Sequence, residues 1–241
     1  MAPQSQAPVI LLTRPIAQSQ RFARSLRTAF GAPLHITIAP LMQVEYLPHT
    51  LPFAPAAGLI FTSEAGLAAY SSLPDPPKAP VWCVGQRTAE MAIKAGLEPV
   101  LVAKNAADLL SAIIAARPDG PFLHLRGQDS FGNIAATLTQ AGIPTTEAVI
   151  YAQRARPLAP HAIRLLATHH PIIVPLFSAR SAALFCAAVQ NHPALHIAAL
   201  SLAVAAAVPS GFAQRIVIAA APDANAMLGA VISLLTNPKA A

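Results

Sequence analysis

Short, continuous apolar runs alternate along this chain with longer segments rich in alanine and leucine. Proline, glycine or polar residues bound each run. A continuous apolar run is typical of a strand buried on both faces, as the strands of parallel sheets are. The predicted strands are Val9–Leu12, Leu34–Ile38, Gly58–Phe61, Val81–Val84, Pro99–Val102, Phe122–Leu125, Thr146–Ile150, Ile172–Phe177, His196–Leu200 and Gln214–Ile218.

The segments between these runs have helical periodicity. Ten strands exceed the usual size of one sheet, so we expect two sheets. The sequence thus predicts an α/β protein with two similar domains, each a mainly parallel, flavodoxin-like sheet of five strands flanked by helices. The predicted helices are Ile16–Ala29, Glu64–Ser72, Thr88–Ala95, Ala106–Ala115, Gly132–Ala141, Ala179–Val189, Ala203–Val208 and Ala224–Leu235.

An internal repeat supports the two domains. Residues 61–70 align with 176–185, residues 81–85 with 197–201, and residues 11–14 with 123–126. The segment with a strand, an arginine and a helix occurs at 9–31, before the block 58–115, and again at 122–142, after that block. The later block 172–235 therefore has no such segment next to it in the sequence. The simplest arrangement brings the N-terminal segment back onto the C-terminal third.

This order predicts the domain boundaries. Residues 1–36 and 157–241 would form a discontinuous first domain, and residues 42–148 a continuous second one. Two extended segments, 37–46 and 145–156, would connect the domains as linker strands.

Composition excludes several classes of protein. Only 11% of the residues are charged and 54% are hydrophobic. Disordered chains and coiled coils contain a much larger share of charged residues, so the chain belongs to neither class. The longest apolar stretch, Ile197 to Pro209, falls short of the roughly 20 residues of a membrane span. The first residues lack the pattern of a signal peptide. We therefore expect a cytoplasmic protein without membrane association.

The net charge of +6 favours an anionic partner. Arginines are scattered and only 5% of the residues are aromatic, so we do not expect nucleic-acid binding. Cys83 and Cys186 stand in apolar runs without a CxxC spacing, and the pair His169-His170 is typical of a loop. We expect no metal site.

Hydroxyl, glycine and arginine residues follow most of the predicted strands. Ligands of open parallel sheets bind at these carboxyl ends, where helix amides can hold anions. The same hydroxyls can instead be N-caps, and the sequence leaves both roles open. Paired domains of this kind would suit a ligand with several carboxylates. The hydroxyl and arginine residues at these positions are Thr13, Arg14, Thr62, Ser63, Arg87, Arg126, Ser178 and Ser201.

Motifs of other enzyme classes are absent: the sequence holds no GxGxxG, GxxxxGK[ST] or GxSxG. The ten acidic residues provide no evident catalytic pair. An enzyme of this composition would depend on positioning and hydrogen bonds.

Six segments in order resemble the uroporphyrinogen-III synthase family over nearly the whole chain. The resemblance implies two α/β domains joined by a two-stranded ladder, with a discontinuous first domain. The segments are VILLTRP (9–15), IFTSEAGL (60–67), VGQRTAEMA (84–92), LRG (125–127), AVIYA (148–152) and LFSARSA (176–182).

The resemblance also implies the reaction. Such a lyase converts hydroxymethylbilane, a linear tetrapyrrole with eight carboxylates, to uroporphyrinogen III. One water is lost, and ring D is inverted through a spiro intermediate. The pathway is porphyrin (heme) biosynthesis, no cofactor or metal takes part, and family members are usually monomers.

The functional tyrosine of the family falls on Tyr151, whose phenol could protonate the departing hydroxyl. The alternative is a tyrosine that only packs at a domain junction. Thr88, Ser63 and Ser178, with Thr62 beside Ser63, match family positions that we assign to carboxylate binding. We add Arg14 and Arg87 for their charge and position. The chain departs from the family at 200–205, where LSLAVA replaces IGPTTA.

Two other functions remain as alternatives. A cytoplasmic bilobal protein that binds a small anion without catalysis would share the duplicated domains and the positive charge. A nucleotide- or sugar-processing enzyme would share the domains but needs phosphate motifs that this chain lacks.

Overall fold

The computed structural model describes residues 7–48, 56–129, 132–190 and 192–237. The chain divides into two compact units, one made of Met1–Gln43 and Ala155–Ala241 and the other of Val44–Arg154. Both changes of unit fall inside the segments predicted as linkers. The ends of the predicted first domain, residues 1–6 and 238–241, lie outside the described residues.

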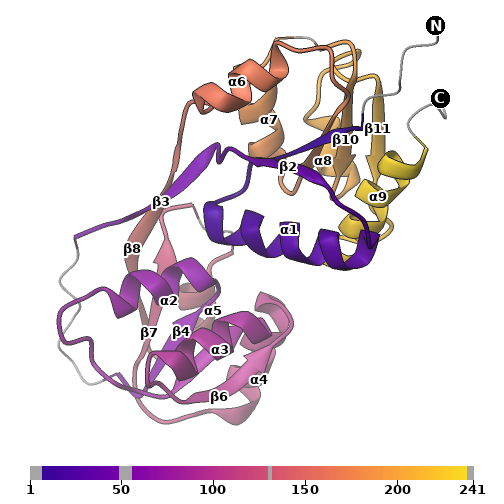
Figure 1. Cartoon of the computed structure of the whole chain (residues 1–241). Helices are drawn as coiled ribbons and strands as arrows, with labels where there is room; N and C mark the ends of the chain where they lie inside the picture. Colours follow the sequence, from indigo (N-terminus) through magenta and orange to yellow (C-terminus); the bar gives the residue numbers. More distant parts are fainter. Residues whose placement is uncertain (1–6, 49–55, 130–131, 191, 238–241) are drawn as a thin grey trace, which may run out of the picture. The chain divides into compact units, whose positions relative to one another are not determined.

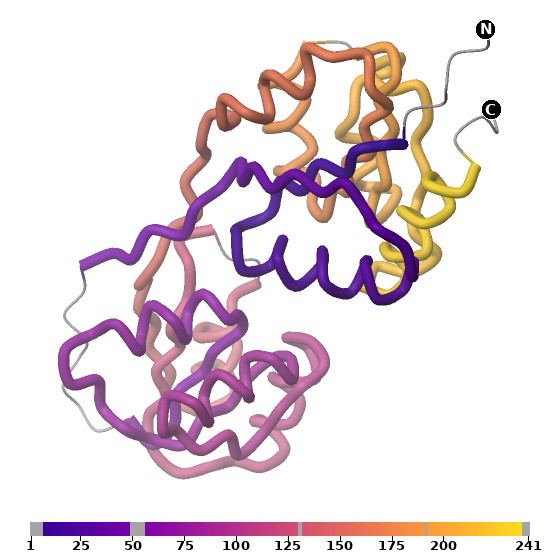
Figure 2. The backbone as a smooth tube through the Cα atoms, viewed as in Figure 1, coloured from indigo at the N-terminus to yellow at the C-terminus, as the bar shows by residue number. Residues whose placement is uncertain are grey.

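The first unit contains a five-stranded sheet of order β11-β10-β9-β1-β2, in which all four neighbouring pairs run parallel. The N-terminal strand therefore lies beside strands from the last third of the chain (Figure 2). The strands are β1 (Val9–Leu12), β2 (His35–Ile38), β9 (Ile172–Leu176), β10 (Leu195–Ala199) and β11 (Arg215–Ile218).

Helices cover both faces of this sheet. On one face, α1 (Ile16–Phe30) and α9 (Ala224–Thr236) pack against the strands. The other face is covered by α6 (Pro160–Leu166), α7 (Ala179–Ala188) and α8 (Leu202–Ala206) (Figure 1).

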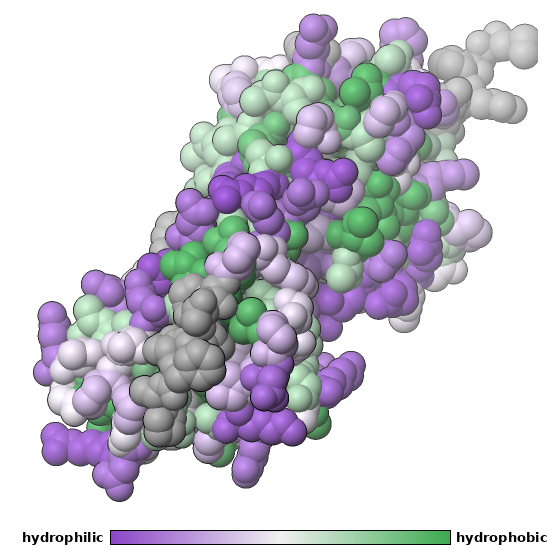
Figure 3. Space-filling model, turned by 90° about the vertical axis from the view of Figure 1, so that its left-hand side faces the viewer, coloured by the Kyte–Doolittle hydropathy of each residue, from purple (hydrophilic) through white to green (hydrophobic). Residues whose placement is uncertain are grey.

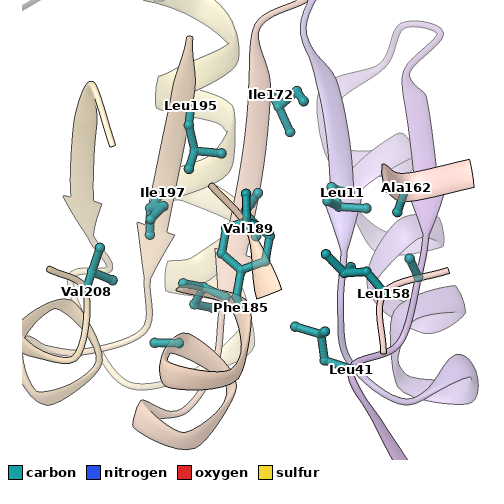
Figure 4. Packing of buried hydrophobic residues seen from close by; sticks show 14 of the residues in the cluster. Leu11, Leu41, Leu158, Ala162, Ile172, Phe185, Val189, Leu195, Ile197 and Val208 are labelled. Carbon is teal, nitrogen blue, oxygen red and sulfur yellow. The ribbon is translucent and has the colours of Figure 1, made fainter. Parts of the chain in front are cut away.

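Side chains of β1 alternate between the two resulting cores. Leu11 packs into the core that contains Leu158 and Phe185 (Figure 4), whereas Ile10 and Leu12 pack into the core that contains Phe22. All three side chains are buried. Burial on both faces explains why the strand sequences are continuously apolar.

The second unit contains a six-stranded sheet of order β3-β8-β7-β4-β5-β6. The pairs among β8, β7, β4, β5 and β6 run parallel. The strands are β3 (Met42–Tyr46), β4 (Gly58–Phe61), β5 (Val81–Val84), β6 (Pro99–Ala103), β7 (Phe122–Gly127) and β8 (Thr145–Ala155).

This sheet is also covered on both faces. Helices α2 (Glu64–Ser71) and α3 (Gln86–Lys94) pack against one face. Helices α4 (Ala106–Ala116) and α5 (Ile134–Gln140) pack against the other. The α/β fold class and the two helix-flanked, mainly parallel sheets are therefore confirmed.

Two details differ from the sequence prediction. The second sheet has six strands instead of five, because β3 joins its edge and the long β8 continues the sheet. The backbone N–H of Leu47 donates to Ile150 O at 2.9 Å, and Glu45 pairs with Arg154 at 2.6 Å. Helix α6 was not predicted; Pro160 stands in its first turn, where a missing N–H costs nothing.

The segments that align in the internal repeat occupy equivalent places in the two sheets. Strands β4, β5, β6 and β7 of the second unit correspond to β9, β10, β11 and β1 of the first. In both sheets a strand with an arginine at or just after its end lies beside the strand that precedes a serine N-cap.

Hydrophilic and hydrophobic residues are interspersed over the surface drawn in Figure 3. Within the described ranges, no helix has both the length and the apolar character needed to cross a bilayer.

A buried histidine stands out in the second unit. His124 of β7 is 3% exposed, and neither ring nitrogen has a hydrogen-bond partner. Burial lowers the pKa of His124 to about 4; the charge of Glu147 opposes this shift and that of Arg126 adds to it. The imidazole is therefore neutral at pH 7.

The free energy of unfolding of this unit should fall as the pH drops from about 6.5 to about 4. Over that range the unfolded chain binds a proton at His124 that the folded chain excludes, a difference of at most about 3 kcal/mol. Fluorescence of Trp82, the chain's one tryptophan, reports on this unit during chemical denaturation. His124→Leu should flatten the pH dependence and His35→Leu, at an exposed histidine, should not; parallel curves for wild type and His124→Leu would contradict the assignment.

Candidate functional site

The predicted residues of the second unit gather at one edge of its sheet. Strands β8, β7, β4 and β5 are neighbours and run parallel, so their carboxyl ends point to the same edge. Thr62 and Ser63 follow β4, Thr88 lies in the first turn after β5, and Tyr151 lies beside the end of β7. Open parallel sheets bind ligands at this edge.

An irregularity between β7 and β8 determines where Tyr151 points. Arg126 pairs with Val149, but the next residue, Gly127, pairs with Tyr151, so β8 holds one extra residue here. Side chains of a regular strand alternate between faces, which would place Tyr151 on the face opposite to Ile150. The extra residue lets Tyr151 join Ile150 in the core beneath α2. Such bulges redirect side chains near functional sites.

The ring of Tyr151 is tightly enclosed, with 8% of the residue exposed. Its hydroxyl lies 2.8 Å from Ser63 Oγ. A Cβ added at Gly127 would lie 2.6 Å from Tyr151 Cζ and 2.9 Å from its hydroxyl oxygen. A Cβ at Gly66 would lie 3.5 Å from Tyr151 Cε1. The absence of a side chain at Gly127 thus leaves the space that the ring fills, whereas a Cβ at Gly66 would only be in ordinary contact with it.

Ser63 has a second role as the N-cap of α2. Its backbone is extended, and its Oγ accepts the N–H of Gly66 at 3.1 Å. The hydroxyl therefore joins the amino end of a helix to the phenol of Tyr151. Of the two roles that the sequence left open for this serine, capping is confirmed, whereas carboxylate binding stays a prediction.

The amino end of α3 has no side-chain cap. Its N-cap is Gly85, whose φ of 85° favours glycine. Arg87 in the first turn is exposed, whereas Thr88 is 3% exposed. Uncapped amides, the helix dipole and an exposed arginine together can bind a carboxylate.

Arg126 already has partners. Its guanidinium pairs with Glu147 and donates to the backbone oxygen of Gly127 at 3.0 Å. The hydrogen bond between the two side chains raises the pKa of Arg126 and lowers that of Glu147. The structure thus assigns Arg126 a contact that stabilises the end of β7, and its part in substrate binding stays a prediction.

The first unit places Thr13, Arg14 and Ser178 at the carboxyl ends of the neighbouring strands β1 and β9. Arg14 Cζ lies 4.0 Å above the ring of Phe177, a cation–π contact. Thr13 is buried, and Ser178 forms a capping box with Ser181 at α7. These residues belong to a different unit from Tyr151.

In the segment that departs from the family pattern, one hydroxyl remains. Ser201 caps α8 through the N–H of Val204, and the neighbouring Leu202 is 76% exposed. In the described part of the chain, no three His, Cys, Asp or Glu side chains are placed to hold a metal ion.

Gly66 and Gly127 were not among the predicted site residues. Both stand inside quoted family segments, EAGL and LRG, which was the available signal. Their role depends on a contact with a residue distant in sequence, which spacing along the chain does not reveal.

Comparisons with known proteins agree with this fold. Residues 20–229 match the family model described as uroporphyrinogen-III synthase HemD. The crystal structure of uroporphyrinogen-III synthetase from Helicobacter pylori has a TM-score of 0.67 at 17% identity, covering 95% of this chain and 100% of that one. A mutant uroporphyrinogen III synthase from Thermus thermophilus has a TM-score of 0.49 at 14% identity, covering 96% and 100%. A search of the curated proteins finds no match.

Replacing Ser63 with alanine should destabilise the second unit more than Asn105→Ala does. Both changes remove the side-chain cap of a helix, worth about 1 kcal/mol. Ser63→Ala also leaves the mostly buried Tyr151 hydroxyl without its partner, which adds about 1 kcal/mol or more. Denaturation followed by Trp82 fluorescence measures both; equal losses would show that the phenol gains nothing from Ser63.

Proposed function

The chain belongs to the uroporphyrinogen-III synthase HemD family, and we propose that it cyclises hydroxymethylbilane to uroporphyrinogen III as a lyase of porphyrin biosynthesis. One water would be lost and ring D inverted, without a cofactor. The observation that carries this proposal is the phenol of Tyr151, which lies at the carboxyl edge of the sheet, hydrogen-bonded to Ser63 and packed against Gly127.

In this proposal Tyr151 acts as the general acid. The terminal hydroxyl of the bilane takes the phenol proton and leaves as water, and an azafulvene cation remains. The substituted carbon of ring D attacks the cation, and the resulting spiro intermediate fragments and closes at the other α-carbon. The proton released at that final closure restores the phenol. A proton donor at the leaving group is typically worth 10²–10⁴ in rate.

The remaining rate enhancement and the choice of isomer would come from binding. Carboxylates of the substrate would bind the amino end of α3, with Arg87, Thr88 and Thr62 close to the same edge. At Ser63 the backbone amides at the start of α2 would take part, since its hydroxyl contacts the phenol of Tyr151. In the first unit, Thr13, Arg14 and Ser178 would bind further carboxylates, and Arg126 would add positive charge. Fixing the bilane lowers the entropic cost of bringing its ends together.

The protein should convert hydroxymethylbilane mainly to isomer III. The bilane closes unaided to isomer I, so the blank gives the reference. Oxidising the products to porphyrins and separating the isomers measures the ratio. Isomer I in excess, as in the blank, would reject the synthase function and leave an anion-binding protein.

Tyr151→Phe should reduce turnover by more than tenfold while the protein stays folded, because phenylalanine keeps the ring and removes the proton donor. Tyr46→Phe, the same change at a half-exposed tyrosine, serves as the matched control and should leave turnover unchanged. Unchanged turnover in Tyr151→Phe would limit the phenol to a packing role.

A further inference from the structure

The backbone conformation of Gly127 does not require a glycine. Its φ lies outside the positive range that favours glycine, so another residue could adopt this conformation. The space for a side chain is occupied instead. The three atoms nearest to an added Cβ all belong to Tyr151, at 2.6, 2.8 and 2.9 Å.

We infer that Gly127 and Ser63 are positioning residues that act on the reaction through the hydroxyl of Tyr151. This inference rests on the proposed function and deepens it. Gly127 fixes how closely the phenol approaches β7, and Ser63 fixes the direction of its hydroxyl. Neither needs to touch the substrate for this role.

The contact at Gly127 determines the position of the ring. Carbon atoms pack at about 3.5–4.0 Å, so a methyl group at residue 127 would force the ring to move by about 1 Å. On the other side of the ring, a Cβ at Gly66 would lie 3.5 Å from Tyr151 Cε1, an ordinary contact distance, so the displaced ring would move toward α2. A displacement of about 1 Å at a reacting group can cost about 10²-fold in rate.

The contact at Ser63 determines the direction of the phenol proton. Ser63 Oγ accepts the N–H of Gly66 and lies 2.8 Å from the phenol oxygen. When Ser63 donates its one proton to Tyr151, the phenol keeps its own proton for the leaving hydroxyl. The same bond then stabilises the phenolate that forms when this proton is transferred.

Gly127→Ala tests the steric part. It should lower kcat by about 10- to 100-fold and change KM by less than about threefold, because substrate carboxylates bind elsewhere. The matched control is Gly58→Ala, where an added Cβ would lie 2.4 Å from a ring atom of Phe122 in the same sheet. That variant should lose stability and keep its kcat.

A double-mutant cycle separates positioning from general damage. In a Tyr151→Phe background the proton donor is already gone, so Gly127→Ala should cause little further loss of kcat. Ser63→Ala should behave in the same way, and Ser63→Thr should restore much of its activity because the hydroxyl returns. Asn105→Ala controls for the lost helix cap.

The outcomes distinguish the two proposals. A wild-type protein that makes no isomer III overturns the synthase function, and the positioning role with it. If the wild type makes isomer III, then an unchanged kcat in both Gly127→Ala and Ser63→Ala, or losses that multiply independently of Tyr151→Phe, overturn only the positioning role. If Gly127→Ala does not fold, the Ser63 cycle decides.

Discussion

The register shift between β7 and β8 is the constraint on which the candidate site depends. With one extra residue in β8, Tyr151 faces the core beneath α2 and lies opposite Gly127. Without that residue the phenol would face away from Ser63 and Gly66. The shift interrupts the regular hydrogen-bond ladder and places the phenol of Tyr151 at the carboxyl edge of a parallel sheet.

The two sheets share a strand order, but the residues at their strand ends make different contacts. Each places a serine N-cap after one strand and an arginine at or just after the end of the neighbouring strand. In the second unit the serine cap meets a tyrosine, whereas in the first the equivalent serine is bonded to Ser181. The phenol therefore belongs to one copy of the repeat, and the general-acid role is proposed for that copy.

Much of the fold could be predicted because its causes are local in the sequence. Strands buried on both faces require continuous apolar runs, and the repeat orders them into two sheets. The edge strand β3 and the short helix α6 carry weaker signals, since β3 is half exposed and α6 begins among prolines. The site was predictable as far as Tyr151 and the strand ends. The role of Gly127 and the ion pair of Arg126 depend on contacts between β7 and β8, whose register no pattern in the sequence specifies.

A crystal structure of the protein with uroporphyrinogen III bound tests the central claim most directly. The account predicts that the Tyr151 hydroxyl stays hydrogen-bonded to Ser63. It should lie in van der Waals contact with the bridging carbon from which the hydroxyl departed, or hydrogen-bond to a water beside that carbon. Carboxylates of the product should contact the amino end of α3. A ligand bound away from the carboxyl edge of the second sheet, or a phenol turned away from the macrocycle, would contradict it.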